Sequence, residues 1–426
     1  MIDIHEKPQK VERAYLIGVQ HQRQSLEEAE ELLEELEELT DTFGVETVYK
    51  KIIRINKSQA RFFCGTGKVQ EIIEECRQVN ADVIIFDEAL SPSQQRNWER
   101  ETKNILVIDR REVILDIFAD RATTKEACLQ IELARAEYNL PRLARAWTHL
   151  SRQRGAVNQK GEGEKQIELD RRMVGKRIQQ LHTELAKVRK QRATQRKQRQ
   201  RKPVPNAAIV GYTNAGKSSL LNLMTDSDVL ADDKLFATLD PTTRKIHLDN
   251  KQELLLTDTV GFIRKLPHDL VDAFKATLEE AVLADFLVHV VDASNANAEE
   301  HMKTTQTILQ ELGADKKRTI TVFNKIDLVE SPLQLSRLRS LAADAFFISV
   351  KSRNGVDLLK EEMSKILETD LSYTELKIPF ENFDMIALIH RTSHIIEEEY
   401  QDEFLIIKAS IPANIHGRVK EFIQPD

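Results

Sequence analysis

The sequence predicts an α/β protein in which a small parallel α/β domain and a long helical hairpin precede a P-loop domain and a short α+β domain. Three observations lead to this prediction. Short apolar runs alternate with helical patterns at the N-terminus, a long basic segment of helix-forming residues follows, and an apolar strand then enters the glycine-containing loop GYTNAGKSS. Alternating strands and helices are typical of parallel sheets. We expect the four domains at residues 1–122, 123–202, 203–370 and 371–426.

The composition indicates several folded domains in a reducing compartment. At about 100–200 residues per domain, the 426 residues allow roughly two to four domains. Cys64, Cys76 and Cys128 show neither paired spacing nor metal-ligand spacing, so we expect reduced thiols. The N-terminus lacks an apolar signal region, and no run approaches the roughly 18 apolar residues of a membrane-spanning helix. We therefore expect a cytoplasmic protein that does not span a membrane.

The first 122 residues follow a regular order of strands and helices. The expected strands are residues 14–20, 47–55, 82–88 and 105–109, and the expected helices are residues 26–39, 69–79, 91–102 and 111 onward. In the first helix, the eight glutamates of SLEEAEELLEELEEL surround an apolar stripe, and we expect this acidic face to be solvated. Residues 64–71 (CGTGKVQE) lack the four-residue spacer of a P-loop, so they predict only a structural turn.

The next segment predicts two long helices joined by a loop. Residues 123–147 have helix-forming composition, and Pro141 should kink or end a turn. After a glycine-containing loop, residues 167–200 predict one helix, with thirteen Lys or Arg between Arg171 and Lys202 and a single acid, Glu184. This basic run is either a solvated helix face or a contact for the phosphates of structured RNA. His182 is its only ring, which argues against stacking on single-stranded bases.

The P-loop signature stands in the context that it requires. Residues 206–211 predict a strand, and helical periodicity follows Lys217. Gly211 and Gly216 let backbone N–H groups close around a phosphate, Lys217 would bridge the β- and γ-phosphates, and Ser218 would bind Mg²⁺. The loop residues expected to complete the cradle are Tyr212, Thr213, Asn214 and Ala215. The Asn214 side chain could also help to hold K⁺ beside the phosphates.

Two further segments predict the switches of a P-loop GTPase domain. Asp258 ends the apolar strand ELLLTD, where its carboxylate can hold Mg²⁺ through water, and the Gly261 N–H can sense the γ-phosphate. Thr259 and Val260 lie between them. Upstream, residues 235–244 (LFATLDPTTR) offer three threonines for the Mg²⁺ ligand of the first switch, and spacing alone does not choose among them. These candidates are Thr238, Thr242 and Thr243.

Two motifs predict that the base is guanine. The Asp327 carboxylate can accept from guanine N1–H and from the N2 amine, and adenine offers neither donor in that geometry. Asn324 would brace the site and the Lys325 stem would cover the base. The Val350 N–H could donate to guanine O6. The complete set of expected base-site residues is Asn324, Lys325, Ile326, Asp327, Ser349, Val350 and Lys351. GTP is the expected substrate.

The residue at position 262, Phe262, predicts slow hydrolysis of GTP. Many GTPases have a glutamine there that orients the attacking water, whereas this chain has Phe262, which cannot form a hydrogen bond with its side chain. We expect isolated protein to turn over slowly and to need a partner or a rearrangement. A core-packing role for Phe262 is an equally natural and compatible interpretation.

The last 56 residues predict a β-α-β-α domain. The expected elements are a strand at residues 376–380, a helix at 382–400, a strand at 403–412 and a helix from 413. This domain is too short for a large independent core, and we expect it to pack on the preceding domain.

Taken together, GYTNAGKSS, LFATLDPTTR, the run from DTVGF to KATLEE and NKID resemble the HflX family of translational GTPases. The segments FDEALSPSQQRNWER, VIDRREVILDIFADRA and RAWTHLSRQRG extend the resemblance, which covers about residues 14–368. It implies a cytoplasmic GTPase that binds the large ribosomal subunit and its rRNA and splits stalled 70S ribosomes under heat or other stress. The hairpin loop would reach toward the peptidyl-transferase centre.

The resemblance also assigns the first switch. Thr238 becomes the second protein ligand of Mg²⁺ beside Ser218, and catalysis is assigned to Lys217, Thr238 and Gly261. The neighbouring nucleotide contacts that it implies are Phe236, Ala237, Leu239 and Asp240. A hydrophobic residue at the position of Phe262 is a family feature. The hairpin loop at residues 155–168 has fewer glycines and more charge than the family pattern, which bears on how strongly it engages rRNA.

Three functions remain in competition. The chain could split ribosomes, serve ribosome assembly or RNA modification, or act as a nucleotide-switched regulator without RNA contact. The basic hairpin favours the first two over the third. We expect a monomer.

Overall fold

The computed structural model describes residues 11–103, 105–143, 162–199, 204–225, 235–236, 238–248, 252–265, 278–369, 371–401 and 403–423. The chain divides into two compact units. The first comprises Met1–Val188, Leu230–Asp240 and Val260–Glu279, and the second comprises Arg189–Val229, Pro241–Thr259 and Glu280–Asp426. Residues 235–240 of the expected first switch and 260–261 of the second therefore belong to the first unit. Residues 241–244, 258–259 and the P-loop belong to the second unit.

The N-terminal sheet has four strands in the order β2-β1-β3-β4, and all neighbouring pairs are parallel, as predicted. Its strands are β1 (Arg13–His21), β2 (Glu46–Ile55), β3 (Val83–Phe86) and β4 (Leu106–Asp109). Its helices are α1 (Leu26–Thr42), α2 (Thr66–Gln78), α3 (Pro92–Thr102) and α4 (Arg110–Arg121). The side chains of Tyr15, Phe86 and Trp98 are fully buried in this core.

The prediction of a solvated acidic face on α1 is wrong for part of that face. Glu35 is buried, and its carboxylate lies 3.0 Å from Arg110 Nη2. Glu31 accepts from Arg264 at 3.0 Å. A helical pattern shows which residues share a face but not which cations another segment brings to it, so sequence alone could not reveal these pairs.

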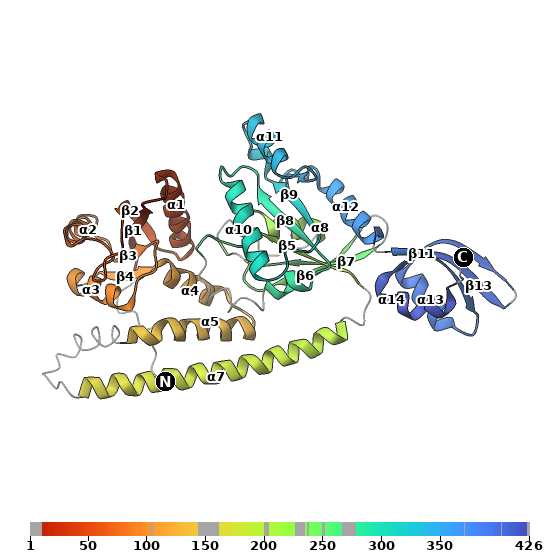
Figure 1. The fold of residues 1–426 in the computed structure, drawn as a ribbon, viewed down its shortest axis with the longest axis horizontal. Helices are drawn as coiled ribbons and strands as arrows, with labels where there is room; N and C mark the ends of the chain where they lie inside the picture. The colour runs from red at the N-terminus through yellow and green to blue at the C-terminus, as the bar shows by residue number, and fades with distance from the viewer. Residues whose placement is uncertain are drawn as a thin grey trace. The chain divides into compact units, whose positions relative to one another are not determined.

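Two helices follow, as the sequence predicts. Helix α5 (Lys125–Asn139) ends where Pro141 enters a 3-10 turn, η1 (Leu140–Arg142), and α7 (Glu162–Arg199) is the long basic helix. The two helices lie side by side (Figure 1), because Leu129 of α5 packs with Leu181 and Leu185 of α7. The predicted start of the long basic helix at residue 167 is wrong, because α7 already begins at Glu162 and takes in the last five residues of the predicted loop at 151–166. The rest of that loop lies outside the described residues.

The second unit contains a six-stranded sheet in the order β10-β9-β8-β5-β7-β6, in which only β6 is antiparallel to its neighbour. Its strands are β5 (Asn206–Gly211), β6 (Thr242–His247), β7 (Glu253–Asp258), β8 (Phe286–Asp292), β9 (Thr319–Asn324) and β10 (Phe346–Phe347). Its helices are α8 (Lys217–Thr225), α10 (Ala298–Glu311), η2 (Ile326–Leu328), α11 (Pro332–Leu341) and α12 (Val356–Thr369). The carboxyl ends of parallel strands meet at one edge, where ligands bind in open α/β sheets.

The C-terminal residues form a three-stranded antiparallel sheet, β11-β13-β12, with a core of its own. Its elements are β11 (Leu371–Pro379), α13 (Phe383–Thr392), β12 (His394–Tyr400), β13 (Phe404–Pro412), α14 (Ala413–Val419) and η3 (Lys420–Phe422). The prediction of one helix over residues 382–400 is wrong, because residues 394–400 pair with β13 instead. Ladder hydrogen bonds outweigh the helix propensity of the glutamates there.

In the part of the chain that the structure describes, no helix is long and apolar enough to cross a membrane.

Candidate nucleotide-binding site

The phosphate loop leaves the centre of the six-stranded sheet. Gly211 ends β5 with φ +148°, and a Cβ there would lie 2.1 Å from the carbonyl oxygen of Val290. Gly216 begins the turn into α8 with φ +93°, and its Cβ would lie 2.3 Å from Asn324 Nδ2. Asn214 between them also has a left-handed φ, +57°. The motif glycines are thus required by backbone conformation and by close approach of neighbouring groups.

Lys217 is buried at the start of α8. Its Nζ donates to the carbonyl oxygen of Tyr212 at 2.6 Å, which folds the lysine back over the loop. Burial lowers the pKa of Lys217 to about 8, although the charge of Asp258 opposes the shift. The Tyr212 ring stacks on His301 of α10, with ring centroids 3.7 Å apart. The Lys217 ammonium group is held by a backbone carbonyl of the loop, where it can also bind a phosphate.

Ser218 and Asp258 lie next to each other at the ends of α8 and β7. The Ser218 hydroxyl donates to Asp258 Oδ2 at 2.6 Å, and Asp258 is fully buried. A hydroxyl and a carboxylate are the hard oxygen donors that Mg²⁺ prefers, so this pair fits a magnesium site shared with phosphate oxygens. Thr259 is fixed beside it, because its hydroxyl donates to the carbonyl oxygen of Ile209 at 2.7 Å.

Asn324 connects two of the predicted motifs. Its Nδ2 donates to the carbonyl oxygen of Ala215 at 3.0 Å, and its Oδ1 accepts from the Val350 N–H at 3.1 Å. This buried amide therefore holds the phosphate loop and the 349–351 loop together. The bracing that the sequence predicts for Asn324 is present, and guanine O6 would compete with Asn324 for the Val350 N–H.

The other base-site residues surround this brace. Lys325 has φ +62°, and its Nζ lies 2.8 Å from Asp292 Oδ2 at the end of β8. Ile326 and Asp327 form the turn η2, where the Asp327 side chain is exposed to solvent. Ser349 is buried and its hydroxyl accepts from the Ser352 N–H at 3.1 Å. Lys351 is exposed.

The first switch segment is divided between the units: its described residues up to Asp240 belong to the first unit, and residues 241–244 belong to the second. Leu239 is buried and Thr238 is half-buried, whereas Ala237 lies outside the described residues. The Asp240 carboxylate binds Thr123 and Thr124 at the start of α5. Thr243, one of the alternative magnesium ligands, lies 2.9 Å from the Thr257 hydroxyl in the sheet, and Thr242 pairs with Asp258 in register. Both of these threonines are residues of β6.

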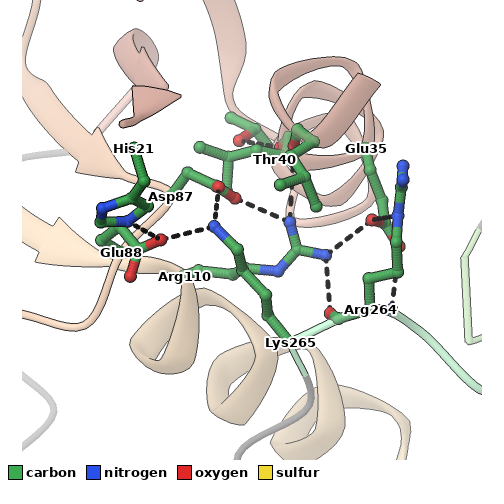
Figure 2. Close-up of polar contacts among 10 residues, drawn as sticks. His21, Glu35, Thr40, Asp87, Glu88, Arg110, Arg264 and Lys265 are labelled. Carbon is green, nitrogen blue, oxygen red and sulfur yellow. Dashed lines mark hydrogen bonds and ion pairs between the residues drawn. The ribbon is translucent and has the colours of Figure 1, made fainter. Parts of the chain in front are cut away.

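The second switch segment is bound to the N-terminal sheet domain within the first unit. Val260 and Phe262 are buried, as the core-packing interpretation of Phe262 expects, and they flank Gly261. Lys265 Nζ lies 2.6 Å from Asp87 Oδ2, and the carbonyl oxygen of Arg264 accepts from Arg110 at 3.1 Å (Figure 2). The chain after Gly261 is therefore anchored by charged groups.

Sequence reasoning missed three polar residues near the predicted motifs. His301 stacks on Tyr212, and Asp292 pairs with Lys325. His289 is buried on β8, and its Nε2 has no hydrogen-bond partner among the described residues. Burial, reinforced by the charge of Lys217, lowers the pKa of His289 to about 4. For His289 and Asp292 the signal was a polar residue within the apolar strand FLVHVVD, but only the strand order places this strand next to β5, which leads into the P-loop.

Comparison with known proteins identifies the family. Protein-family models match at residues 30–119 ("GTP-binding GTPase N-terminal"), 121–199 ("GTP-binding GTPase Middle Region") and 206–325 ("50S ribosome-binding GTPase"). GTPase HflX of Akkermansia muciniphila is 49% identical over 99% of both chains, and GTPase HflX of Chlamydia pneumoniae is 42% identical over 99% of this chain and 90% of that protein. A crystal structure of a GTP-binding protein from the archaeon Sulfolobus solfataricus with GDP is 27% identical, covers 83% of this chain and 98% of that chain, and superposes with a TM-score of 0.46. The identity to the two HflX proteins over nearly the whole length, together with the family models, shows that the chain belongs to the HflX family of GTP-hydrolysing enzymes and carries a ribosome-binding GTPase domain.

Proposed function

We propose that this GTPase binds the large ribosomal subunit in the cytoplasm and uses GTP to split stalled 70S ribosomes under stress. The observation that carries the proposal is the long basic helix α7 in a chain whose nucleotide-binding domain matches a 50S ribosome-binding GTPase model. A helical arm rich in cations, in the same chain as a GTP-dependent switch, can couple nucleotide state to contact with rRNA. The monomeric state of the protein is part of the same proposal.

The charge distribution on α7 suits a phosphate backbone. One side packs on α5 through Leu181 and Leu185, and Arg177 forms two hydrogen bonds of 2.7 Å with Glu132. The cations with exposed side chains are Arg171, Arg172, Lys176, Lys187, Arg189 and Lys190. Exposed cations that neutralise phosphates release counterions, so their contribution to RNA binding falls as salt rises. The hairpin loop would extend this surface toward the rRNA.

The nucleotide site supports GTP hydrolysis with Mg²⁺. Lys217 would contact the β- and γ-phosphates, and Ser218 and Thr238 would hold the metal, with Asp258 acting through water. When bound, Mg²⁺ neutralises charge on the β- and γ-phosphate oxygens. The Gly261 N–H would detect the γ-phosphate. The remaining assignments to the phosphates and switches are Gly211, Tyr212, Thr213, Asn214, Ala215, Gly216, Phe236, Ala237, Leu239, Asp240, Thr259 and Val260.

The base site selects guanine. The exposed Asp327 carboxylate would accept from guanine N1–H and N2, and the left-handed turn at Lys325 presents its stem to the base. Asn324, Ile326, Ser349, Val350 and Lys351 complete this site. The carboxylate at Asp327 is the group that distinguishes GTP from ATP.

Hydrolysis by the isolated protein is slow in this proposal. The buried Phe262 cannot orient water, so the ribosome raises the rate by fixing the switches in a competent geometry. K⁺ held in part by Asn214 would add positive charge beside the phosphates, and equal hydrolysis rates in K⁺ and Na⁺ would remove this element of the proposal.

Sedimentation tests the function. Stalled 70S ribosomes mixed with the protein and a non-hydrolysable GTP analogue should separate into subunits on a sucrose gradient. If the 70S peak persists while the protein sediments with free 50S precursors, ribosome assembly or RNA modification becomes the better function. A protein that sediments with neither would refute both.

A charge-reversal variant tests the role of α7. Changing Lys187, Arg189 and Lys190 to glutamate should weaken 50S binding and flatten its salt dependence by about two to three units of log–log slope. Nucleotide affinity should stay the same. Reversal of three exposed cations on α10 and α11, Lys303, Arg337 and Arg339, is the matched control. Equal effects of the two variants on 50S binding would show that α7 has no specific contact.

A further inference from the structure

The Asp240 carboxylate caps the first helix of the hairpin. Its Oδ2 accepts from the Thr123 N–H at 3.0 Å, the Thr123 hydroxyl at 2.6 Å and the Thr124 N–H at 2.9 Å. Its Oδ1 accepts from the Thr124 hydroxyl at 2.6 Å. Asp240 is the last residue of the part of the first switch segment that belongs to the first unit. One switch side chain therefore forms four hydrogen bonds with two successive residues outside the switch.

These bonds act on the N-cap of α5. Thr124 is the N-cap residue, and its hydroxyl accepts from the Ala127 N–H at 3.3 Å while it donates to Asp240. Hydrogen bonds in such a chain strengthen one another, and a negative charge at a helix N-terminus interacts favourably with the helix dipole. Burial alone would raise the pKa of Asp240, but the hydrogen bonds from Thr123 and Thr124 lower it, so the cap stays ionised at neutral pH.

A second contact holds the other end of the same segment. The Phe236 ring lies edge-on to Phe118 at the end of α4, with centroids 4.5 Å apart, and Phe236 has φ +56°. Leu239 is buried as well. Residues 236 and 240 are thus both fixed on the junction between α4 and α5, and Thr238 lies midway between the two contacts.

This arrangement makes two events depend on one ordered segment. Ordering a residue costs backbone entropy, and Thr238 can bind Mg²⁺ only when its segment is ordered. If the α4–α5 junction already orders the segment, GTP binding is easier. By linkage, GTP binding must then stabilise the contact with α5 by the same factor. GDP lacks the γ-phosphate that draws in the first switch, so it should not share this coupling.

We propose that the Asp240 cap on α5 couples GTP binding to the base of the basic hairpin. GTP orders the first switch, the ordered switch caps α5, and α5 in turn packs on α7 through Leu129. Asp240 and Thr123 are therefore positioning residues that favour the GTP-bound state without contact between Thr123 and the nucleotide. The inference rests on the proposed role of Thr238 in binding Mg²⁺ with GTP.

The test compares affinities for GDP and for a non-hydrolysable GTP analogue. Asp240→Ala removes the carboxylate that accepts all four hydrogen bonds, and Thr123→Val removes the Thr123 hydroxyl, one of the donors to that carboxylate. Both variants should weaken analogue binding by about fivefold or more. Thr123 has no place in the nucleotide site, so the GDP affinity of Thr123→Val should stay within about twofold of that of the unchanged protein. The double variant should be no weaker than Asp240→Ala, because the two changes break the same contact. Ser91→Ala, which removes the N-cap of α3 in the same unit, is the matched control.

Hydrogen exchange supplies a readout independent of affinity. The analogue should slow exchange at the Ala127 and Cys128 amides of the unchanged protein but not of Asp240→Ala. Unchanged GTP-to-GDP selectivity in both cap variants would overturn the inference, as would an equal shift in Ser91→Ala. Failure of the unchanged protein to bind the analogue would instead refute the proposed nucleotide site.

Discussion

Substitution of Gly216 by alanine should disable the nucleotide site through one identifiable neighbour. Gly216 has φ +93°, and the added Cβ would lie 2.3 Å from Asn324 Nδ2, far inside any permitted contact. The left-handed conformation costs an alanine about 1–2 kcal/mol. Asn324 must also move, and it would lose its bonds to the Ala215 carbonyl oxygen and the Val350 N–H. At about 1 kcal/mol each, these bonds add about 2 kcal/mol.

The chain provides a control that separates the cost of the left-handed backbone from the loss of the two Asn324 hydrogen bonds. Gly313 has φ +73°, but a Cβ there meets nothing within 4 Å. Gly313→Ala should therefore show only the backbone cost of about 1–2 kcal/mol. Gly216→Ala should in addition lose the two hydrogen bonds of Asn324. Their loss of about 2 kcal/mol corresponds to a weakening of GDP binding by about 30-fold.

Fluorescent GDP titration and thermal unfolding of both variants provide the measurements. Gly313→Ala should melt slightly earlier and bind GDP normally, whereas Gly216→Ala should lose affinity as well. Equal GDP affinity in the two variants would refute the argument that Asn324 transmits the damage. Asn324→Ala should reproduce the loss without any backbone strain.

Three further predictions follow from other parts of the molecule. Asp327→Asn should shift preference from GTP toward XTP, because an amide can donate to the xanthine O2; unchanged selectivity in a competition assay would remove Asp327 from the base site. Burial lowers the pKa of His289 from 6.5 to about 4, so below pH 6.5 the unfolded chain binds a proton that the folded chain does not. The free energy of unfolding should therefore fall by about 1.4 kcal/mol per pH unit between pH 6.5 and the folded pKa. Urea unfolding at pH 7 and pH 5 should show a smaller loss of unfolding free energy between the two pH values for His289→Gln than for the unchanged protein. Arg110→Met should lower stability by about 3–5 kcal/mol, since it leaves the buried carboxylates of Glu35 and Asp87 without a common cation, and a melting temperature equal to that of Lys303→Met would contradict this.

The sequence by itself determined the local elements and the chemical identity of the nucleotide site. The four-strand parallel sheet, the end of α5 before Pro141 and the strand-loop-helix around Lys217 follow from period, turn residues and motif spacing. These features depend on neighbours along the chain, and such neighbours are visible in a sequence. The roles of individual site residues stay predictions, although the Asn324 brace was expected and is present.

Only the tertiary structure decided which distant residues meet. No local pattern could show that Asp240 caps α5, that Glu35 of an apparently solvated face binds Arg110, or that His289 lies buried near Lys217. The helix predicted at residues 382–400 failed for the same reason, because β13 supplies ladder partners that the local glutamates do not reveal. Hydrogen bonds and ion pairs between residues 23 to 233 positions apart depend on how the strands and helices pack, and packing is a property of the whole fold.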